Sequence, residues 1–452
     1  MSKKHLIDVL KHQRVTRPAW VPFAGVHAGL LKQLSPEKVL TDADALIEAL
    51  KEVHRLYQPD GMPVTFDLQL EAEILGCELK FAPQGPPQVV SHPLKGDKTI
   101  PCDCMMPSKD SGRLPVVLKA TQALHETLGD QTALYGLVCG PLTLASHLRG
   151  TEIFIDMYDD MDYVKGLIDF CSRFIMTIAE YYLEAGADVI AIVDPLVSQI
   201  STEHFNEMLD KPYRQMFDQL RDKQAFSSFF VCGDATRNIE AMCQTKPDSI
   251  SIDENIDIAK AKLITDRHNI VLGGNIPLTT VMLHGNQQDN MKYVIDMVDS
   301  LEESDRNLIV SPGCDMPYDT PIDNVIAISQ AIRQADATRQ SLTNYEKVDE
   351  DDQTVDLPDY DSLEKPLIEV FTLDSATCAA CTYMKGIADD AKEHYGDAID
   401  VVEYKYTMKE TIARCKAMGV KNLPSIYING VLRFSSIIPS MDELHAAIKK
   451  VI

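Results

Sequence analysis

The chain has 452 residues and a formal net charge of −25 at pH 7. An acidic surface repels the phosphate groups of nucleic acids and of anionic membranes, so we expect neither as a partner. Hydrophobic residues make up 45% of the sequence, which suffices for a large core and excludes a mostly disordered chain. Apolar runs are too short for a bilayer crossing or a secretory signal, so we expect a cytoplasmic protein. Eleven cysteines in such a protein indicate thiols, metal ligands or redox centres.

Residues 1–343 alternate strand-like and helix-like stretches. Most of the strand-like runs are short, apolar and ended by Gly, Pro or Asp, as buried parallel strands are. Eight such runs separated by helices predict an α/β fold, a (β/α)₈ barrel of the TIM type. Residues 68–130 are too many for a simple loop and predict an inserted lid or hairpin. The expected strands are Trp20–Val26, Gly61–Asp67, Ala133–Cys139, Asp188–Asp194, Ser227–Cys232, Asp248–Asp253, Asn269–Asn275 and Asn307–Pro312.

Residues 344–365 contain nine acidic side chains and show no apolar period. Like charges repel one another, so this composition predicts an extended acidic linker between two domains. An acidic surface loop inside a single domain is the alternative.

Residues 366–452 predict a small second α/β domain. A strand at Leu367–Thr372 precedes a helix that opens with the CxxC motif Cys378–Cys381, and a second strand, a helix, a hairpin and a last helix follow. Pro424 stands directly before the hairpin. This order is typical of a thioredoxin-like domain.

The ends of the expected barrel strands carry polar and thiol side chains. Chemistry in such barrels takes place at the carboxyl ends of the strands. Cys139 can be a small buried hydrophobe and Asp253 a helix cap, whereas Cys232 and Cys314 lie at glycine-marked turns, where a functional role is favoured. The residues at these ends are His27, Asp67, Cys139, Asp194, Cys232, Asp253, Asn275 and Cys314.

Two thiolates that meet at a barrel mouth suit zinc. A catalytic zinc site has about three protein ligands and one open position. A substrate thiol bound there would lose its proton near neutral pH and become a nucleophile.

Several stretches resemble the uroporphyrinogen decarboxylase superfamily over about residues 10–335. SPGCDMP together with VCGD is most similar to its cobamide-dependent methyltransferases, of the methylcobamide:coenzyme M methyltransferase type. The resemblance implies methyl transfer between a corrinoid, free or protein-bound, and a small thiol at a zinc ion held by a His-x-Cys pair and a distant Cys. By this resemblance Cys232 and Cys314 are zinc ligands. The stretches are YGLVCGPLTLASHLRG, EAGADVIAIVDP, VCGD, LGGNIPL and SPGCDMPYDTPIDNV.

The chain departs from that pattern at Phe230, which stands where the family has its histidine. A third ligand must then come from another strand end, and we expect Asp194, or else His27, to supply it. We expect His27, Asp67 and Asn275 to bind substrate.

Uroporphyrinogen decarboxylation is disfavoured. Pro22 and Val26 occupy the positions of the two arginines that bind substrate carboxylates in the decarboxylase. Without those cations, an acidic domain would repel a substrate that carries many carboxylates.

Residues 367–452 resemble thioredoxins and glutaredoxins. The resemblance implies that Cys378 is the nucleophilic thiol, that Cys381 resolves the mixed disulfide, and that Pro424 is a cis-proline beside them. A zinc knuckle and a redox-inert docking domain are the alternatives. Cys102 and Cys104 form a Cys-x-Cys pair that is either a target of this domain or incidental.

The sequence therefore gives two hypotheses. The first is a corrinoid-dependent methyltransferase with a redox-active CxxC appendage. The second is a thiol-disulfide oxidoreductase whose barrel binds a corrinoid protein or a small ligand. Phe230 favours the second hypothesis, whereas the pairing of Cys232 with Cys314 favours the first. The metal content of the purified protein distinguishes them.

Overall fold

The computed structural model describes residues 2–301, 308–345, 355–360, 362–376 and 379–452. The chain divides into two compact units, Met1–Val197 with Ser201–Tyr345, and Glu346–Ile452 with Ser198–Ile200. Among the described residues, no helix combines the length and the apolar character that a bilayer crossing requires.

The first unit is built around eight parallel strands in the order β1-β10-β9-β8-β7-β6-β5-β2. All eight lie within or beside the runs expected from the sequence, and they form a nearly closed parallel barrel, consistent with the predicted TIM-type fold. The strands are β1 (Ala19–Trp20), β2 (Gly61–Pro63), β5 (Ala133–Cys139), β6 (Val189–Val193), β7 (Phe226–Val231), β8 (Ser249–Ile252), β9 (Val271–Ile276) and β10 (Leu308–Pro312).

Asp60 links the two edge strands of this sheet. Its backbone N–H donates to the carbonyl of Trp20 over 2.9 Å. Its carboxylate accepts from the Trp20 N–H over 2.8 Å and pairs with Arg17 at 2.6 Å. One buried side chain therefore joins β1 to the start of β2, where the strand ladder is interrupted.

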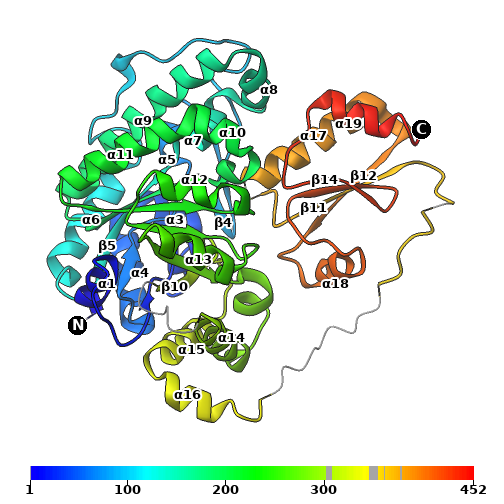
Figure 1. The fold of residues 1–452 in the computed structure, drawn as a ribbon. Helices are drawn as coiled ribbons and strands as arrows, with labels where there is room; N and C mark the ends of the chain where they lie inside the picture. Colours follow the sequence, from blue (N-terminus) through cyan, green and yellow to red (C-terminus); the bar gives the residue numbers. More distant parts are fainter. Residues whose placement is uncertain (1, 302–307, 346–354, 361, 377–378) are drawn as a thin grey trace. The chain divides into compact units, whose positions relative to one another are not determined.

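Helices surround the strands (Figure 1). The longest, α9, turns an apolar face inward, and Val164, Ile168 and Ile175 on it are completely buried. The other long helices are α4 (Ala43–Tyr57), α6 (Leu114–Leu128), α11 (Asp210–Asp222), α13 (Ile258–Arg267), α14 (Gln287–Ser300) and α15 (Ile322–Arg333), and α9 spans Met161–Glu184. The shorter ones are α1 (Ser2–Leu10), α2 (His27–Leu30), α3 (Pro36–Thr41), α5 (Leu70–Ile74), α7 (Pro141–Arg149), α8 (Glu152–Asp159), α10 (Thr202–His204), α12 (Ile239–Gln244) and α16 (Ala335–Ser341).

The segment between β2 and β5 holds an antiparallel hairpin, β3 (Leu79–Ala82) and β4 (Gly85–Val89). The expected insertion with extra hairpin structure is therefore present.

The second unit has a four-stranded sheet in the order β12-β11-β13-β14. β11 is parallel to β12 and antiparallel to β13, and β13 forms a hairpin with β14. Tyr360, from the segment expected to be linker, donates to Glu369 on β11 over 2.7 Å. The elements are β11 (Leu367–Thr372), α17 (Ala379–Tyr395), β12 (Asp400–Lys405), α18 (Lys409–Ala417), β13 (Ser425–Ile428), β14 (Val431–Ser435) and α19 (Met441–Ile448).

Candidate functional site

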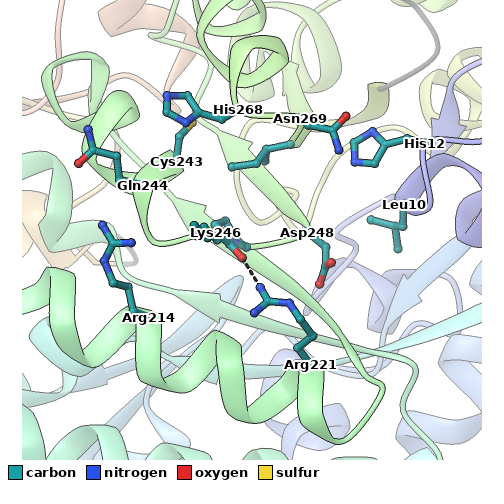
Figure 2. Close-up of a pocket in the computed structure, with 12 residues that line it drawn as sticks. Leu10, His12, Arg214, Arg221, Cys243, Gln244, Lys246, Asp248, His268 and Asn269 are labelled. Carbon is teal, nitrogen blue, oxygen red and sulfur yellow. Dashed lines mark hydrogen bonds between the residues drawn. The ribbon is translucent and has the colours of Figure 1, made fainter.

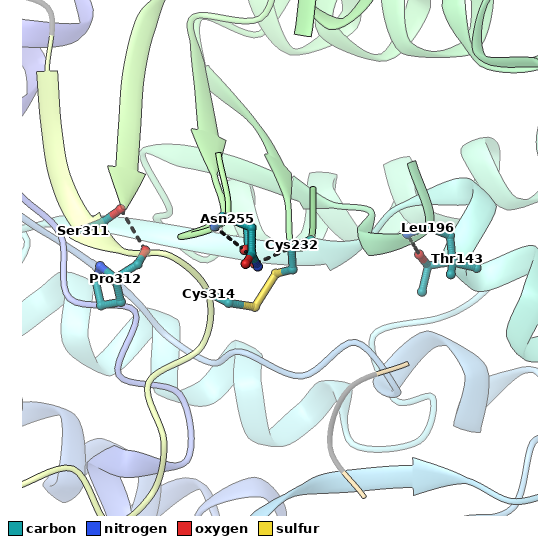
Figure 3. The surroundings of a disulfide bond; sticks show 9 residues. Thr143, Leu196, Cys232, Asn255, Ser311, Pro312 and Cys314 are labelled. Carbon is teal, nitrogen blue, oxygen red and sulfur yellow. Dashed lines mark hydrogen bonds between the residues drawn. A yellow bond between two sulfur atoms is a disulfide. The ribbon is translucent and has the colours of Figure 1, made fainter. Parts of the chain in front are cut away.

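Cys232 and Cys314 meet at the carboxyl end of the barrel. Cys232 follows β7 directly and Cys314 comes two residues after β10. Their sulfurs are joined in a disulfide, and their Cα atoms lie 5.7 Å apart. Figure 3 shows this bond with Asn255 beside it. The prediction that these two side chains lie together at one end of the barrel is confirmed, and their role as a functional site stays a prediction.

An aromatic cluster lies beneath the two cysteines. The ring of Phe230 lies 4.9 Å from that of Phe23 and 5.8 Å from that of Phe66, measured between centroids. Cys232 and Cys314 both pack against the hydrophobic core that contains these rings. The position that a zinc-binding histidine would take is therefore filled by a completely buried phenylalanine.

The carboxylate of Asp194 accepts hydrogen bonds from the first turn of α7. Its Oδ1 accepts from the backbone N–H and the hydroxyl of Thr143 at 2.9 and 2.6 Å, and its Oδ2 accepts from Leu142 N–H and the Tyr213 hydroxyl at 3.0 and 2.8 Å. A Cβ on Gly140 would lie 2.2 Å from that of Asp194, so glycine is required there. Burial raises the pKa of this carboxyl. The side chain acts as a buried helix cap.

His27 is buried, and both of its ring nitrogens have partners. Nδ1 lies 2.8 Å from the Tyr318 carbonyl and Nε2 lies 2.7 Å from the Tyr57 hydroxyl. Burial lowers the pKa of the ring to about 4, so the neutral imidazole prevails at pH 7. The ring has no free nitrogen with which to bind a metal in this conformation.

The residues expected to bind zinc are therefore not brought together. Among the described residues, no group of three His, Cys, Asp or Glu side chains is placed to hold a metal ion. The donor set at Cys232 and Cys314 lacks the third ligand that a zinc site needs, because the oxygens of Asp194 and the nitrogens of His27 are engaged elsewhere.

Asp67 forms a buried ion pair that the sequence analysis did not anticipate. Its carboxylate is bound by Arg113, whose Nε also pairs with Glu73 at 2.6 Å. Arg113 is separated from Asp67 by 46 residues, and lies at the start of α6. The sequence shows these charged residues, but their spacing along the chain does not reveal that Arg113 pairs with Asp67.

Glu71 lies beside this ion pair and is completely buried. Its Oε1 accepts from the Cys139 N–H over 3.0 Å, whereas its Oε2 has no hydrogen-bond partner among the described residues. Burial raises the pKa of Glu71 to about 8. This carboxyl therefore holds its proton near neutral pH.

Asn275, at the end of β9, supports the neighbouring turn. Its Nδ2 donates to the carbonyls of Asp253 and Ile256 at 2.9 and 2.8 Å. The carboxylate of Asp253 in turn accepts from the N–H of Gly233, next to Cys232, over 2.7 Å. Asp253 is thus a turn-forming residue that fixes the backbone beside the cysteine pair, and substrate binding by Asn275 stays a prediction.

The remaining cysteines of the first unit fall into two groups. Cys102 and Cys104 form an exposed disulfide in the inserted segment. Cys77, Cys139, Cys171 and Cys243 are buried, and burial raises the pKa of each thiol. The alternative in which Cys139 is a small buried hydrophobe is confirmed.

In the second unit, Cys381 lies in the first turn of α17. Its sulfur accepts from the Leu373 N–H over 3.3 Å and is buried. The Leu423–Pro424 peptide bond is cis, as the resemblance implied. Cys378 lies outside the described residues, so its predicted role stays a prediction.

A pocket of about 510 Å³ lies away from these residues, at the opposite end of the barrel strands. Figure 2 shows Arg221 donating to the Lys246 carbonyl there, over 2.7 Å. Arg214 and Arg221 are paired with Asp210 and Asp218. Because both arginines already have carboxylate partners, they do not make this pocket a strong anion site.

Comparison with known proteins places this barrel in a family. The chain is 29% identical over 335 residues to the methylcobamide:CoM methyltransferase MtbA of Methanosarcina acetivorans, which covers 72% of this chain and 95% of that protein. It is 24% identical over 291 residues to the uroporphyrinogen decarboxylase of Nostoc punctiforme, covering 62% of this chain and 80% of that protein.

The barrel also resembles a solved structure, a methyltransferase from Methanosarcina mazei. The TM-score is 0.67 with 22% identity, over 74% of this chain and 98% of that one, which shows a common fold. The model of the uroporphyrinogen decarboxylase (URO-D) family matches residues 1–335. This chain is therefore a member of the uroporphyrinogen decarboxylase family.

Proposed function

We propose that this protein transfers a methyl group between a corrinoid, free or protein-bound, and a thiol-type acceptor at the carboxyl end of the barrel. The observation that carries the proposal is the joint placement of Cys232 and Cys314 there. The likeness to MtbA along 95% of that protein's length supports it.

The transfer requires a sulfur nucleophile. An acceptor thiol loses its proton, and its electron pair forms a sulfur–carbon bond as the cobalt–carbon bond breaks with its pair left on cobalt. A sulfur that is bonded to another sulfur has no thiolate pair to offer. The proposed activity therefore needs Cys232 and Cys314 in their reduced form.

Zinc is left out of the proposed reaction. Phe230 removes the family's histidine, and the described residues present no third ligand beside the two cysteines. Zinc binding by Cys232 and Cys314, implied by the resemblance, and by Asp194, expected in place of the histidine, stays a prediction that these contacts do not support.

Decarboxylation remains disfavoured despite the family name. Pro22 and Val26 are buried apolar residues, and the carboxyl of Glu71, on α5, lies beside the end of β5, where it accepts from the Cys139 N–H. Arg113 is already paired with Asp67 and Glu73. A polycarboxylate substrate would find no uncommitted arginine among these residues.

Demethylation of methylcobalamin tests the proposal. Purified protein, methylcobalamin and a small thiol should give the visible spectrum of demethylated cobalamin, and Cys314→Ala should abolish the change. Cys243→Ala is the matched control, because that thiol is buried outside this site and should be dispensable. No spectral change with any small thiol would contradict the proposed transfer.

The second candidate function is thiol-disulfide exchange by the second unit. The sheet order β12-β11-β13-β14 and the position of Cys381 at the start of α17 favour a thioredoxin-like domain. Cys381→Ser should then trap a mixed disulfide on Cys378, and mass spectrometry would identify its partner. A wild-type pair that stays reduced under mild oxidant would contradict this role.

A further inference from the structure

We propose that Cys232 and Cys314 form a redox site of their own, a disulfide at the barrel mouth whose substrate is a dithiol. This function takes the place of the metal binding expected of the same pair. The inference concerns the barrel, and it does not depend on the CxxC motif of the second unit.

The barrel backbone itself brings the two thiols together. Two other strands, β8 and β9, separate β7 from β10 in the sheet, yet the Cα atoms of Cys232 and Cys314 lie 5.7 Å apart. Disulfides span Cα distances of about 4.4–6.8 Å. The fold thus presents a pair that can bond directly, without a metal ion to draw the sulfurs together.

The surroundings favour a neutral disulfide over two metal-bound thiolates. Both cysteines pack on the hydrophobic core that contains Phe230 and Phe23. An apolar environment disfavours the charged form of a thiol. Two thiolates would need a compensating cation, and the cation would need a third ligand that Phe230 cannot supply, whereas a disulfide carries no charge.

The pair is also reachable from solvent. Cys232 and Cys314 are half-buried. Several other thiols of the chain are buried, which should protect them from reagents: Cys77, Cys139, Cys171, Cys243 and Cys415. A dithiol in solution can therefore reach this disulfide while those thiols stay protected.

The exchange balances without any further reactant. One thiolate of the dithiol attacks a sulfur of Cys232–Cys314 and forms a mixed disulfide, and the second thiolate then displaces the remaining cysteine. Two electrons and two protons pass to the barrel, and the dithiol leaves as a disulfide. If the proposed function holds, the reduced pair is the form that is competent for methyl transfer; this step alone rests on that proposal.

Thiol counting on the full-length chain tests the inference. Replacing Cys102, Cys104, Cys378 and Cys381 by serine removes the other candidate redox cysteines. In air-equilibrated native protein we expect no cysteine to react with iodoacetamide. After dithiothreitol treatment and its removal, two cysteines per chain should react, and the intact mass should rise by two hydrogens before labelling.

Cys232→Ser in the same background is the matched control. It leaves Cys314 alone, so one cysteine should react without reductant and dithiothreitol should add none. Labelling of the buried cysteines would report an unfolded sample, and the measurement is then repeated on Cys232→Ala, which keeps the site apolar.

Two results would overturn the inference. One is a pair that remains alkylatable after incubation with glutathione disulfide. The other is one zinc per chain, with both thiols blocked until a chelator is added. No methyl donor is present in this assay, so its failure leaves methyl transfer untouched, and a failed methylcobalamin assay leaves the redox site untouched.

Discussion

The ring of Phe230 lies 4.9 Å from the ring of Phe23, inside the barrel and two residues before Cys232. The contact joins β7 to the segment that follows β1. The resemblance to cobamide-dependent methyltransferases implies a zinc-binding histidine at the position of Phe230. Phe230 thus makes a packing contact where the resemblance implies a metal ligand, and Cys232 and Cys314 are bonded to each other.

Phe230→His should create a zinc site. The substitution would place an imidazole two residues before Cys232 and complete a three-ligand set with Cys314. After anaerobic purification with zinc and gel filtration, we expect about one zinc per chain in the variant and far less in the wild type, measured by elemental analysis. Burying a polar ring among aromatic side chains should lower the unfolding free energy by about 1–3 kcal/mol.

Phe229→His is the matched control for this change. Phe229 is equally buried but stacks on Tyr213 with 4.0 Å between ring centroids, on the other face of β7. It should gain no zinc. Equal zinc in the two variants, or none in Phe230→His, would show that the missing histidine is not what prevents metal binding.

Arg113→Met should destabilise the barrel by about 3–5 kcal/mol, because it leaves the carboxylate of Asp67 buried without its partner. Lys119→Met removes an exposed pair with Asp44 and should cost under about 1 kcal/mol. Trp20 is the single tryptophan and lies in the barrel, so its fluorescence during urea unfolding reports this unit. Equal effects of the two changes would contradict the assigned ion pair.

Glu71→Gln should alter how stability depends on pH. The folded carboxyl keeps its proton up to about pH 8, whereas the unfolded one loses it near pH 4.5. Between these values the native state binds more protons, so the wild-type unfolding free energy falls as pH rises, by at most about 1.4 kcal/mol per pH unit. The glutamine keeps an acceptor for the Cys139 N–H and does not titrate.

The stability of Glu71→Gln relative to the wild type should therefore increase from pH 5 to pH 8, as measured by urea unfolding with Trp20 fluorescence. Glu126→Gln, on the exposed side of α6, should leave the wild-type profile unchanged. A constant difference between Glu71→Gln and the wild type across this range would mean that Glu71 is ionised in the folded state.

The strands could be predicted because each is a local pattern. Ala133–Cys139 and Leu367–Thr372 have the bounds expected from their apolar runs and flanking residues. The run Trp20–Val26 was too long, since β1 ends at Trp20. Beyond it, Val21 donates to the Val310 carbonyl over 3.1 Å and the chain then turns toward α2.

The site could be predicted only in part, because hydrogen bonding depends on distant residues. Strand ends identified Cys232 and Cys314 as neighbours. They also suggested Asp194 as a zinc ligand, but Thr143 and Tyr213, 51 and 19 residues away, take up its oxygens. The spacing of residues along one strand does not reveal these hydrogen bonds.

The redox dependence of methyl transfer tests the central claim, that the reactive centre of this barrel is the Cys232–Cys314 pair. One preparation would be divided into two samples, of which one is oxidised in air and the other is reduced with dithiothreitol and desalted. Methylcobalamin demethylation would then be followed in both. We predict a lag in the oxidised sample, while the added thiol reduces the disulfide, and no lag in the reduced sample. Superimposable progress curves, or full activity in a variant with both cysteines replaced by alanine, would contradict the claim.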